Sequence, residues 1–437
     1  MYNILDYGAV PDGKVLNTQA IQDAVDACHA AGGGTVVVPP GKFITGTVFL
    51  KSRVHLHLES GALLQGSPNM DDYCSDDAYE QNAKANREGW RGAHLIAAVE
   101  AEDVMLSGPG IIDGNCDAFF IPPGTTIDAK WAGGLAWARG IRVNDSSKID
   151  YRPGQMVVFV QCRRVQVENI TLRNSTCWTL FLHGTRQAVI KGVIIDNPVD
   201  GINTDGIDID CSSQVTVSDC IITVGDDAIT LRASGARLKD HPPVCEDITV
   251  TNCVLDSSVC AFRLGVGAGV IRNAVISNIV IRFAGLGFLL QPSYGRNGAG
   301  VRIENISASN IRARQLGHPV RIIAGAEDVG DGAVRNIDFS NFRCECAGNI
   351  EIAGNQMMHP QRISFRDCAF DVVNRPCFCR EDKCPDTFFL ISLADNILFK
   401  DCELNWLSPD PEWKFLEKIS QVDGLEKINC SFPELKK

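Results

Sequence analysis

A short apolar segment with one polar residue near its centre recurs along the chain from residue 165 onward. Nine copies share this format: VQVENITL, AVIKGVII, VTVSDCII, ITVTNCVL, AVISNIVI, ISASNIRA, IDFSNFRC, ISFRDCAF and ILFKDCEL. Their polar residues, called pivots below, lie 23 to 34 residues apart and are Asn169, Gly192, Asp219, Asn252, Asn278, Asn310, Asn341, Asp367 and Asp401. Strand-like units repeating at such a period are typical of a solenoid. We therefore expect an all-β protein, a parallel β-helix with loops of different lengths emerging from constant rungs.

The residue after each pivot is apolar or cysteine, namely Ile170, Val193, Cys220, Cys253, Ile279, Ile311, Phe342, Cys368 and Cys402. Because cysteine alternates there with aliphatic and aromatic residues, the four cysteines are predicted to pack in the core. The chain has 18 cysteines, about 4% of its residues, and we expect free thiols. The group Cys377, Cys379 and Cys384 has spacing that suits a soft metal but lacks a fourth ligand, so a thiol-containing loop is favoured.

One domain is expected over residues 1–437, with different sequence formats near its ends. Asn17 is a suitable cap for a helix that would cover the first rungs, within an N-terminal cap of residues 1–70. Residues 405–437 are expected to close the other end. Residues 122–152 fit no rung and are expected to form a long loop on the binding face.

The composition narrows the possible partners. A formal net charge of −12 argues against a nucleic-acid surface. No run of eighteen apolar residues occurs, so we expect no membrane segment. The first residues show no basic stretch followed by an apolar one, which favours a cytoplasmic location. The oligomeric state is left open.

Three carboxylates define the candidate site. Asp205 and the pair Asp226-Asp227 are a little over twenty residues apart, which is about one turn of a coiled β fold, so they are expected to stack. Clustered carboxylates suit cleavage of a glycosidic bond, because one protonates the leaving oxygen while another activates water. Each motif alone is more often a simple turn, and calcium binding by the same oxygens is a further alternative.

Strand alternation predicts which neighbouring side chains share the outer face with these carboxylates. In CAFRLG, Phe262 and Leu264 are expected to point inward and Arg263 outward. One rung further, Leu289 and Gln291 take the outward positions. The outward face thus changes from acidic to basic and then to uncharged along successive rungs.

The chain resembles glycoside hydrolase family 28, the polygalacturonase-like enzymes, over most of its length. The resemblance runs through LDYGAVPDG, AIQDAVDAC, GTVFLKSRVHLHLESGALL and ITLRNSTCWTL, and NTDGIDID followed by GDDAI is its most specific part. It implies a right-handed parallel β-helix and an inverting hydrolase that needs no cofactor and no metal. Asp226 would be the general acid, Asp205 and Asp227 would position and deprotonate water, and Asn203 would be a neighbouring site residue.

Two motifs of the family are missing. Cys260 occupies the place of the usual histidine, and Leu289 to Gln291 replace the Arg and Lys that bind the substrate carboxylate in polygalacturonases. Either Arg263 reads that carboxylate instead, or the −1 sugar is not a uronic acid and Arg263 only pairs with another carboxylate. Both possibilities stay open.

The leading hypothesis is a hydrolase that acts on a pectin-type or related plant-cell-wall oligosaccharide, in an exo fashion and with an altered −1 subsite. Its predicted substrate-binding residues are Asn203, Arg263, Gln291, Trp178, His183 and Tyr294. The alternatives are a β-helix polysaccharide lyase or epimerase that acts on uronates, and a carbohydrate-binding β-helix without turnover.

Overall fold

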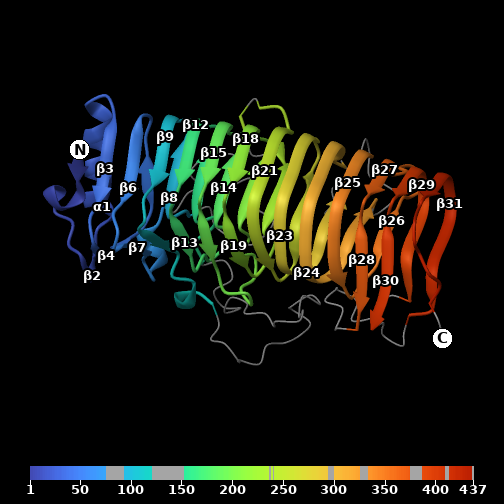
Figure 1. Cartoon of the computed structure of the whole chain (residues 1–437). Helices are drawn as coiled ribbons and strands as arrows, with labels where there is room; N and C mark the ends of the chain where they lie inside the picture. Colours follow the sequence, from blue (N-terminus) through green and yellow to red (C-terminus); the bar gives the residue numbers. More distant parts are fainter. Residues whose placement is uncertain are drawn as a thin grey trace. The chain divides into compact units, whose positions relative to one another are not determined.

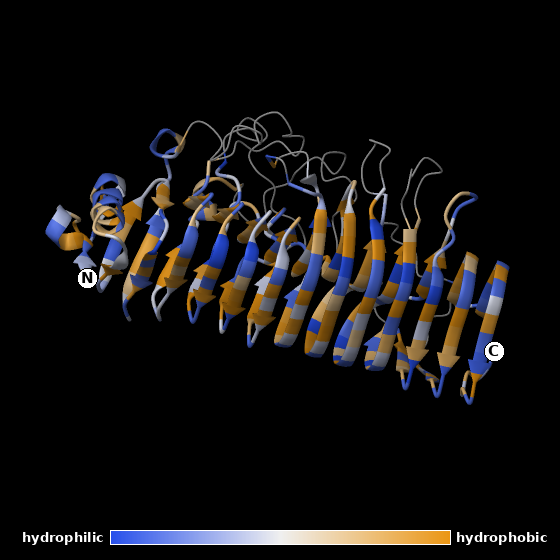
Figure 2. Cartoon of the chain, turned by 90° about the horizontal axis from the view of Figure 1, so that it is seen from above, coloured by the Kyte–Doolittle hydropathy of each residue, from blue (hydrophilic) through white to orange (hydrophobic). Residues whose placement is uncertain are grey.

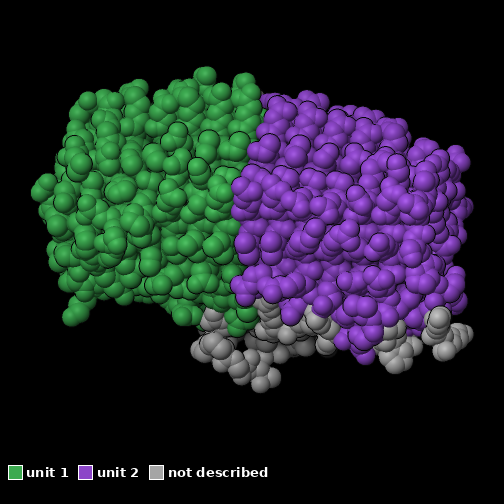
Figure 3. Space-filling view, viewed as in Figure 1, with its two compact units in different colours: residues 1–128, 141–226, 236–241 green, residues 129–140, 227–235, 242–437 purple. Residues whose placement is uncertain are grey.

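The computed structural model describes residues 1–74, 93–120, 152–235, 238–239, 241–293, 300–324, 333–374, 386–408 and 413–435. The chain divides into two compact units, coloured separately in Figure 3. The first comprises Met1–Asp128, Ile141–Asp226 and Ala236–His241, and the second comprises Ala129–Gly140, Asp227–Gly235 and Pro242–Lys437. The single-domain organisation expected from the sequence stays a prediction.

The described part of the first unit contains short strands and a few helical segments. The helices are η1 (Ile4–Tyr7), α1 (Thr18–Ala30), η2 (Met70–Asp72) and η3 (Cys116–Ala118). The strands are β1 (Tyr2–Asn3), β2 (Asp12–Leu16), β3 (Gly34–Val38), β4 (Gly41–Thr45), β5 (Val48–Leu50), β6 (Val54–Leu58), β7 (Ala62–Gly66), β8 (Ile96–Val99), β9 (Glu102–Ser107), β10 (Ile111–Asp113), β11 (Val157–Val160), β12 (Arg163–Glu168), β13 (Thr171–Arg173), β14 (Leu180–His183), β15 (Arg186–Lys191), β16 (Ile194–Asp196), β17 (Ile207–Asp210), β18 (Ser213–Ser218) and β19 (Ile221–Val224).

The second unit has longer strands, several of which continue through bends. They are β20 (Ile229–Ala233), β21 (Val244–Ser257), β22 (Cys260–Gly267), β23 (Val270–Gln291), β24 (Arg302–Ile323), β25 (Ala333–Cys346), β26 (Ile350–Ala353), β27 (Gln361–Arg366), β28 (Ala369–Val373), β29 (Thr387–Lys400), β30 (Glu403–Ser408) and β31 (Phe415–Ile428). Figure 1 shows the strands of each unit stacked side by side as successive rungs.

Successive rungs of the first unit pair with one another in parallel. Strands β8, β11, β14 and β17 form one column, and β9, β12, β15 and β18 form a second. The third column contains β10, β13, β16 and β19. Parallel pairing also joins β21 to β23 and β23 to β24 in the second unit. The predicted all-β fold with parallel coiled strands is confirmed, while the right-handed sense of the coil stays a prediction.

The predicted pivots are backbone bends. All nine have a positive φ, from 48° at Asn341 to 63° at Gly192. Glycine adopts this left-handed conformation without steric cost, and asparagine and aspartate do so more readily than other residues. The recurrence of Asn, Asp and Gly therefore has a local backbone cause, and it marks the same bend in successive rungs.

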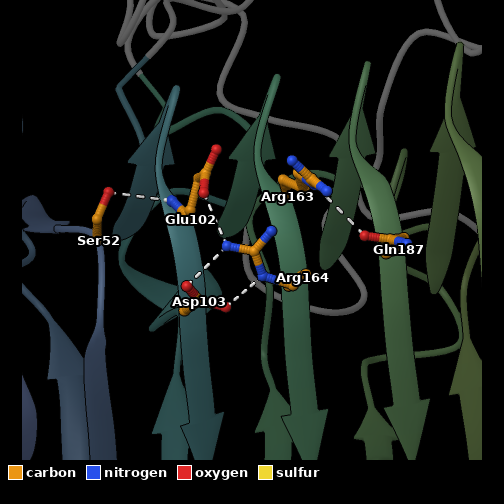
Figure 4. A network of polar contacts seen from close by, with 6 residues as sticks. All are labelled: Ser52, Glu102, Asp103, Arg163, Arg164 and Gln187. Atoms are coloured by element: carbon orange, nitrogen blue, oxygen red, sulfur yellow. Dashed lines mark hydrogen bonds and ion pairs between the residues drawn. The ribbon is translucent and has the colours of Figure 1, made fainter.

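A second series of bends has side chains that contact one another from rung to rung. In the first unit, Arg164 on β12 lies against Glu102 and Asp103 on β9, at 2.7 and 2.5 Å (Figure 4). In the second unit, the Asn305 amide donates to the Asn273 side-chain oxygen and the Asn336 amide donates to that of Asn305. We call Asn273, Asn305 and Asn336 the asparagine ladder.

Alternating side chains fill the interior of each unit, and Figure 2 shows the corresponding alternation of polar and apolar residues along the strands. The four cysteines predicted to lie in the core are buried, at no more than 1% exposure. Phe262 stacks on Phe288, with ring centroids 4.9 Å apart. Thiols are present, as expected, at Cys28, Cys162, Cys344, Cys346, Cys368, Cys402 and Cys430. Cys377, Cys379 and Cys384 lie outside the described residues.

Helix α1 forms close to where it was predicted, and its buried residues Ile21, Ala24, Val25 and Cys28 face the first strands. Asn17 is the N-cap residue of this helix, as predicted, but its side chain makes no cap hydrogen bond. Instead its oxygen accepts from the Val10 N–H at 2.6 Å and its amide donates to the Val15 carbonyl at 2.7 Å. Asn17 thus ties together the segment before the helix.

The C-terminal segment expected to close the coil forms a further strand, β31, which pairs in parallel with β29. The predicted long loop at residues 122–152 lies outside the described residues except for Arg152.

None of the helices in the described ranges combines the length and apolar character that crossing a bilayer requires.

Candidate active site

Asp205 and Asp226 lie together in the first unit. Asp205 is two residues before β17 and Asp226 is two residues after β19. Each offers a carboxylate oxygen within 4.8 Å of the other. Asp205 is 4% exposed, whereas Asp226 is only partly buried. The predicted stacking of these two carboxylates is therefore present, and only one of them is nearly closed to solvent.

Hydrogen bonds to the main chain hold the segment that carries Asp205. The Asp205 carbonyl accepts from both the N–H and the hydroxyl of Thr179, at 2.9 and 2.7 Å. Asn197 in turn donates its amide to the Thr179 hydroxyl at 2.7 Å and to the Thr204 carbonyl at 3.2 Å. Asn197 is 4% exposed, so its amide is protected from competition by water. Its supporting role was not predicted from the sequence.

Asn203 connects the turn before Asp205 to Asp226. Its φ is 53°, a left-handed conformation that asparagine tolerates. Its backbone N–H donates to the Asp226 Oδ2 at 3.2 Å. Asn203 was predicted as a site residue, and the structure adds that its main chain contacts a candidate catalytic carboxylate.

Arg152 is a contact of this turn that sequence reasoning missed. The sequence places Arg152 only at the end of the predicted long loop and indicates no role for it in the site. In the structure its side chain is buried, at 3% exposure. Its Nη2 donates to the Asn203 side-chain oxygen at 3.0 Å. No local sequence signal could have revealed this contact, because the two residues are 51 positions apart.

Asp227 follows Asp226 directly in the chain and is described with the second unit. It is 2% exposed, and its Oδ2 lies 3.1 Å from Nη1 of Arg263 on β22. Its Oδ1 is buried and has no hydrogen-bond partner within the described parts of the chain. Of the two roles considered for Arg263, the structure shows the pairing with a carboxylate. Reading of a substrate carboxylate by Arg263 stays a prediction.

The register beyond Arg263 is the one expected from strand alternation. Arg263 pairs with Leu289, and Gly265 pairs with Gln291. Leu289 is 8% exposed and belongs to an apolar cluster with Val259, Cys260 and Leu286. Gln291 is partly buried at the end of β23. The position next to Arg263 is therefore apolar, and Cys260, at the place of the family histidine, is part of the same cluster.

Trp178 and His183 were predicted to contact sugar, but both are buried in the structure. Trp178 is 2% exposed and packs edge to face on Phe181, with centroids 5.2 Å apart. His183 has no exposed surface and stacks on Phe181, with ring centroids 5.0 Å apart. Their sugar contacts, and that of Gln291, stay predictions, and Tyr294 lies outside the described residues.

Among the residues that the structure describes, two groups of side chains have donor atoms suited to a metal. Asp205 and Asp226 offer hard oxygen donors of the type that calcium prefers, but calcium takes about six to eight oxygens. His183, Asp210 and Cys211 offer nitrogen, oxygen and sulfur within 4.8 Å, a donor set closer to that of zinc. All three are at most 2% exposed. Such burial fits a metal site, and it fits as well residues that only pack against the neighbouring apolar cluster, to which Cys211 belongs.

Comparison with known proteins identifies the family. Residues 28–324 match Glycosyl hydrolases family 28. A Probable polygalacturonase of Vitis vinifera is 30% identical over 53% of this chain and 44% of its own length. An Exo-poly-alpha-D-galacturonosidase of Dickeya chrysanthemi is 28% identical over 71% of this chain and 55% of its own length. The chain therefore belongs to glycosyl hydrolase family 28, and it spans about half the length of these two relatives.

Solved structures show the same fold. The Yersinia enterocolitica Family 28 Exopolygalacturonase superposes with a TM-score of 0.72 at 20% identity, over 97% of this chain and 77% of the other. The hyperthermoactive Exopolygalacturonase of Thermotoga maritima gives 0.66 at 22% identity, over 85% and 86%. The fold expected from the repeat is thus the fold of these two solved structures.

Proposed function

We propose that this protein is a glycoside hydrolase that removes terminal sugars from pectic oligosaccharides made of galacturonate or a related sugar. Asp226 acts as the general acid, and Asp205 and Asp227 position and deprotonate the attacking water. Family membership supports the reaction class, and the names of the two exopolygalacturonase structures support exo action.

The observation that carries the assignment of roles is the contrast between two adjacent carboxylates. Asp227 is buried and forms an ion pair with the Arg263 guanidinium, with Oδ2 3.1 Å from Nη1. Asp226 is partly exposed and accepts a bond from an uncharged N–H. Carboxylates in different surroundings can divide acid and base duties between them. The buried, charge-paired Asp227 suits the base, and the more exposed Asp226 suits the acid.

The stereochemical outcome is part of the proposal. Inverting enzymes usually separate their carboxyl groups by about 6.5–9.5 Å and retaining enzymes by about 5–5.5 Å. One oxygen of Asp205 and one of Asp226 lie within 4.8 Å of each other, a limit that assigns neither class because the classes differ in the separation of whole carboxyl groups. Inversion, with Asp205 and Asp227 activating water, rests on the family resemblance. The anomer first released is therefore the decisive observable.

The −1 subsite is proposed to differ from that of a typical polygalacturonase. Leu289 and Gln291 replace basic residues, and the Arg263 Nη1 contacts Asp227. A subsite with an apolar wall tolerates an uncharged C6 group, such as a methyl ester, better than a site built around two cations. We also propose a right-handed coil, a capping role for α1 and a cytoplasmic location.

The test is digestion of a panel of galacturonate oligomers, free and methyl-esterified, with time-resolved NMR of the first product. Release of terminal sugar with inverted configuration is expected. Asp226→Asn and Asp227→Asn should each lower turnover of oligomers by roughly 10²–10⁴-fold with the fold intact. Asp196→Asn, at an exposed position at the end of β16, is the matched control and should leave turnover unchanged.

Other results would select the alternatives. An unsaturated product absorbing in the ultraviolet would indicate a lyase. Oligosaccharide binding without product after long incubation would indicate a binding protein. Wild-type turnover in Asp226→Asn or Asp227→Asn would sink the assignment of roles, and a retained configuration would leave a hydrolase with a different use of Asp205.

A further inference from the structure

The side chain of Arg152 bridges two segments of the first unit next to the candidate acid. Its Nη1 donates to the Thr176 carbonyl at 2.8 Å and to the Ile202 carbonyl at 3.3 Å. Its Nη2 donates to the Asn203 side-chain oxygen at 3.0 Å. One buried cation thus contacts both the segment before β14 and two successive residues of the turn before β17.

An arginine is well suited to this position. The guanidinium is planar and presents its N–H groups in a rigid fork, so several acceptors can be held at fixed angles at once. At 3% exposure its hydrogen bonds are little weakened by competing water. A lysine ammonium is a compact donor on a flexible stem and would not hold the Ile202 carbonyl and the Asn203 amide in the same geometry.

The turn held by Arg152 contacts Asp226 through its main chain. Asn203 has a φ of 53°, and its N–H donates to Asp226 Oδ2 at 3.2 Å. When one carboxyl oxygen accepts an N–H bond, the proton of the acid form is best placed on the other oxygen, here Oδ1. The direction in which Asp226 presents its proton therefore depends on the position of the Asn203 N–H.

We propose that Arg152 is a positioning residue for the general acid, acting through Asn203. This inference rests on the proposed function. In the cleavage step the glycosidic C–O bond breaks, and the proton moves from Asp226 Oδ1 to the leaving oxygen. Water adds to the anomeric carbon and gives up one proton to Asp205 or Asp227, the carboxylates proposed to activate it. Asp226 becomes a carboxylate, and the Asn203 N–H bond to Oδ2 strengthens as this charge develops. Arg152 keeps that donor in place, so its effect is greatest where proton donation limits the rate.

The test compares two substrates that differ in their need for an acid. A galacturonate dimer has a poor leaving group that must be protonated, whereas 2,4-dinitrophenyl α-galacturonide has a leaving group that departs as an anion. Arg152→Gln is expected to lower kcat on the dimer by about 10²-fold, because small misplacements of a catalytic group are costly. On the dinitrophenyl substrate it should lower kcat only a few-fold, with KM for both nearly unchanged. Arg152→Lys should fall between wild type and Arg152→Gln.

Arg164→Gln is the matched control, because it also removes an arginine of the first unit that bonds to several oxygens. It should leave both rates unchanged. Equal loss on both substrates for Arg152→Gln, or no loss on either, would overturn the positioning role. Circular dichroism and thermal melting show whether each variant is folded, and an unfolded Arg152→Gln would leave Arg152→Lys to carry the same comparison.

Asp226→Asn, measured in parallel, separates this inference from the proposed function. Loss on the dimer with retention on the dinitrophenyl substrate confirms Asp226 as the acid, and Arg152→Gln must then follow the same pattern in weaker form. If Asp226→Asn turns over the dimer like wild type, the acid assignment fails, and the role of Arg152 fails with it. If only Asp226→Asn shows the pattern, the inference on Arg152 alone is refuted.

Discussion

The two units of this protein differ in where they use charged contacts, both at the bends between rungs and at the candidate catalytic carboxylates. In the first unit, the ion pairs of Arg164 with Glu102 and Asp103 bridge the bend between rungs. The candidate acid Asp226 accepts a hydrogen bond from an uncharged backbone N–H. In the second unit, the bend is bridged by the uncharged asparagine ladder, while Asp227 is held by the Arg263 guanidinium.

Burial decides how much each arrangement matters. The Arg164 side chain is 38% exposed, and its partners are about half exposed, so solvent and salt weaken these ion pairs. The Arg263 and Asp227 side chains are 10% and 3% exposed, so their interaction is screened far less. An arginine–carboxylate ion pair is thus weak at the exposed bend of Arg164 and strong where it holds Asp227, a candidate catalytic residue. The following changes test this difference, from the largest expected effect to the smallest.

Arg263→Gln should have the largest effect on stability. It leaves the buried carboxylate of Asp227 without its cation, and breaking a buried pair in this way costs about 3–5 kcal/mol. The measurement is the free energy of unfolding from urea titration. Arg263→Lys, which keeps a positive charge, should lose less. A loss below that of a typical surface substitution would show that the pair is not what stabilises this region.

Acid should destabilise the first unit through His94. Burial at 1% exposure lowers the pKa of His94 to about 4, while Nδ1 lies 2.8 Å from the Gln155 carbonyl. In the unfolded chain its pKa is about 6.5, so between these values the unfolded state binds the proton and stability falls as pH falls. The full loss is about 3 kcal/mol, reached near pH 4, and there is none above pH 7.

The check is urea unfolding between pH 4 and 7.5 for wild type and His94→Gln. The variant has no titrating group at this position, so its stability should depend less steeply on pH below 6.5. Identical slopes for the two proteins would contradict the prediction.

Asn305→Ala should cost less than Arg263→Gln and should be independent of salt. Alanine pays about 1–2 kcal/mol for the left-handed backbone at φ 59°, and two amide hydrogen bonds of the ladder are lost. Asn305→Gly removes the same amide but adopts this backbone freely. The difference in unfolding free energy between the two variants separates the backbone cost from the ladder. Equal values would show that the backbone conformation contributes nothing.

Arg164→Gln should have the smallest effect, and only that effect should depend on salt. Its contacts with Glu102 and Asp103 are exposed, and ionic strength near 1 M reduces the Debye length to about 3 Å. Melting temperatures of the variant and wild type should differ slightly at low salt and coincide at high salt. A difference that persists at high salt would mean that these ion pairs resemble the buried pair of the second unit.

The sequence alone predicted the rungs well, because their signals are local. Asn, Asp and Gly recur at the pivots since each must adopt a positive φ, and the residue after each pivot is apolar since it enters the core. Strand alternation also predicted that Leu289 lies beside Arg263. The proximity of Asp205 and Asp226 followed from the repeat length.

Only the tertiary structure decided what each site residue contacts. The sequence by itself predicted a family 28 β-helix with carboxylates one rung apart. It could do so because the left-handed backbone preference and the alternation of side chains are each set by a few neighbouring residues. It could not show that Arg152 reaches Asn203, that Arg263 pairs with Asp227, or that Trp178 and His183 are buried. The contacts of Arg152 and Arg263 join residues 51 and 36 positions apart in the chain. The burial of Trp178 and His183 depends on how the surrounding segments pack against them. No local pattern specifies that packing.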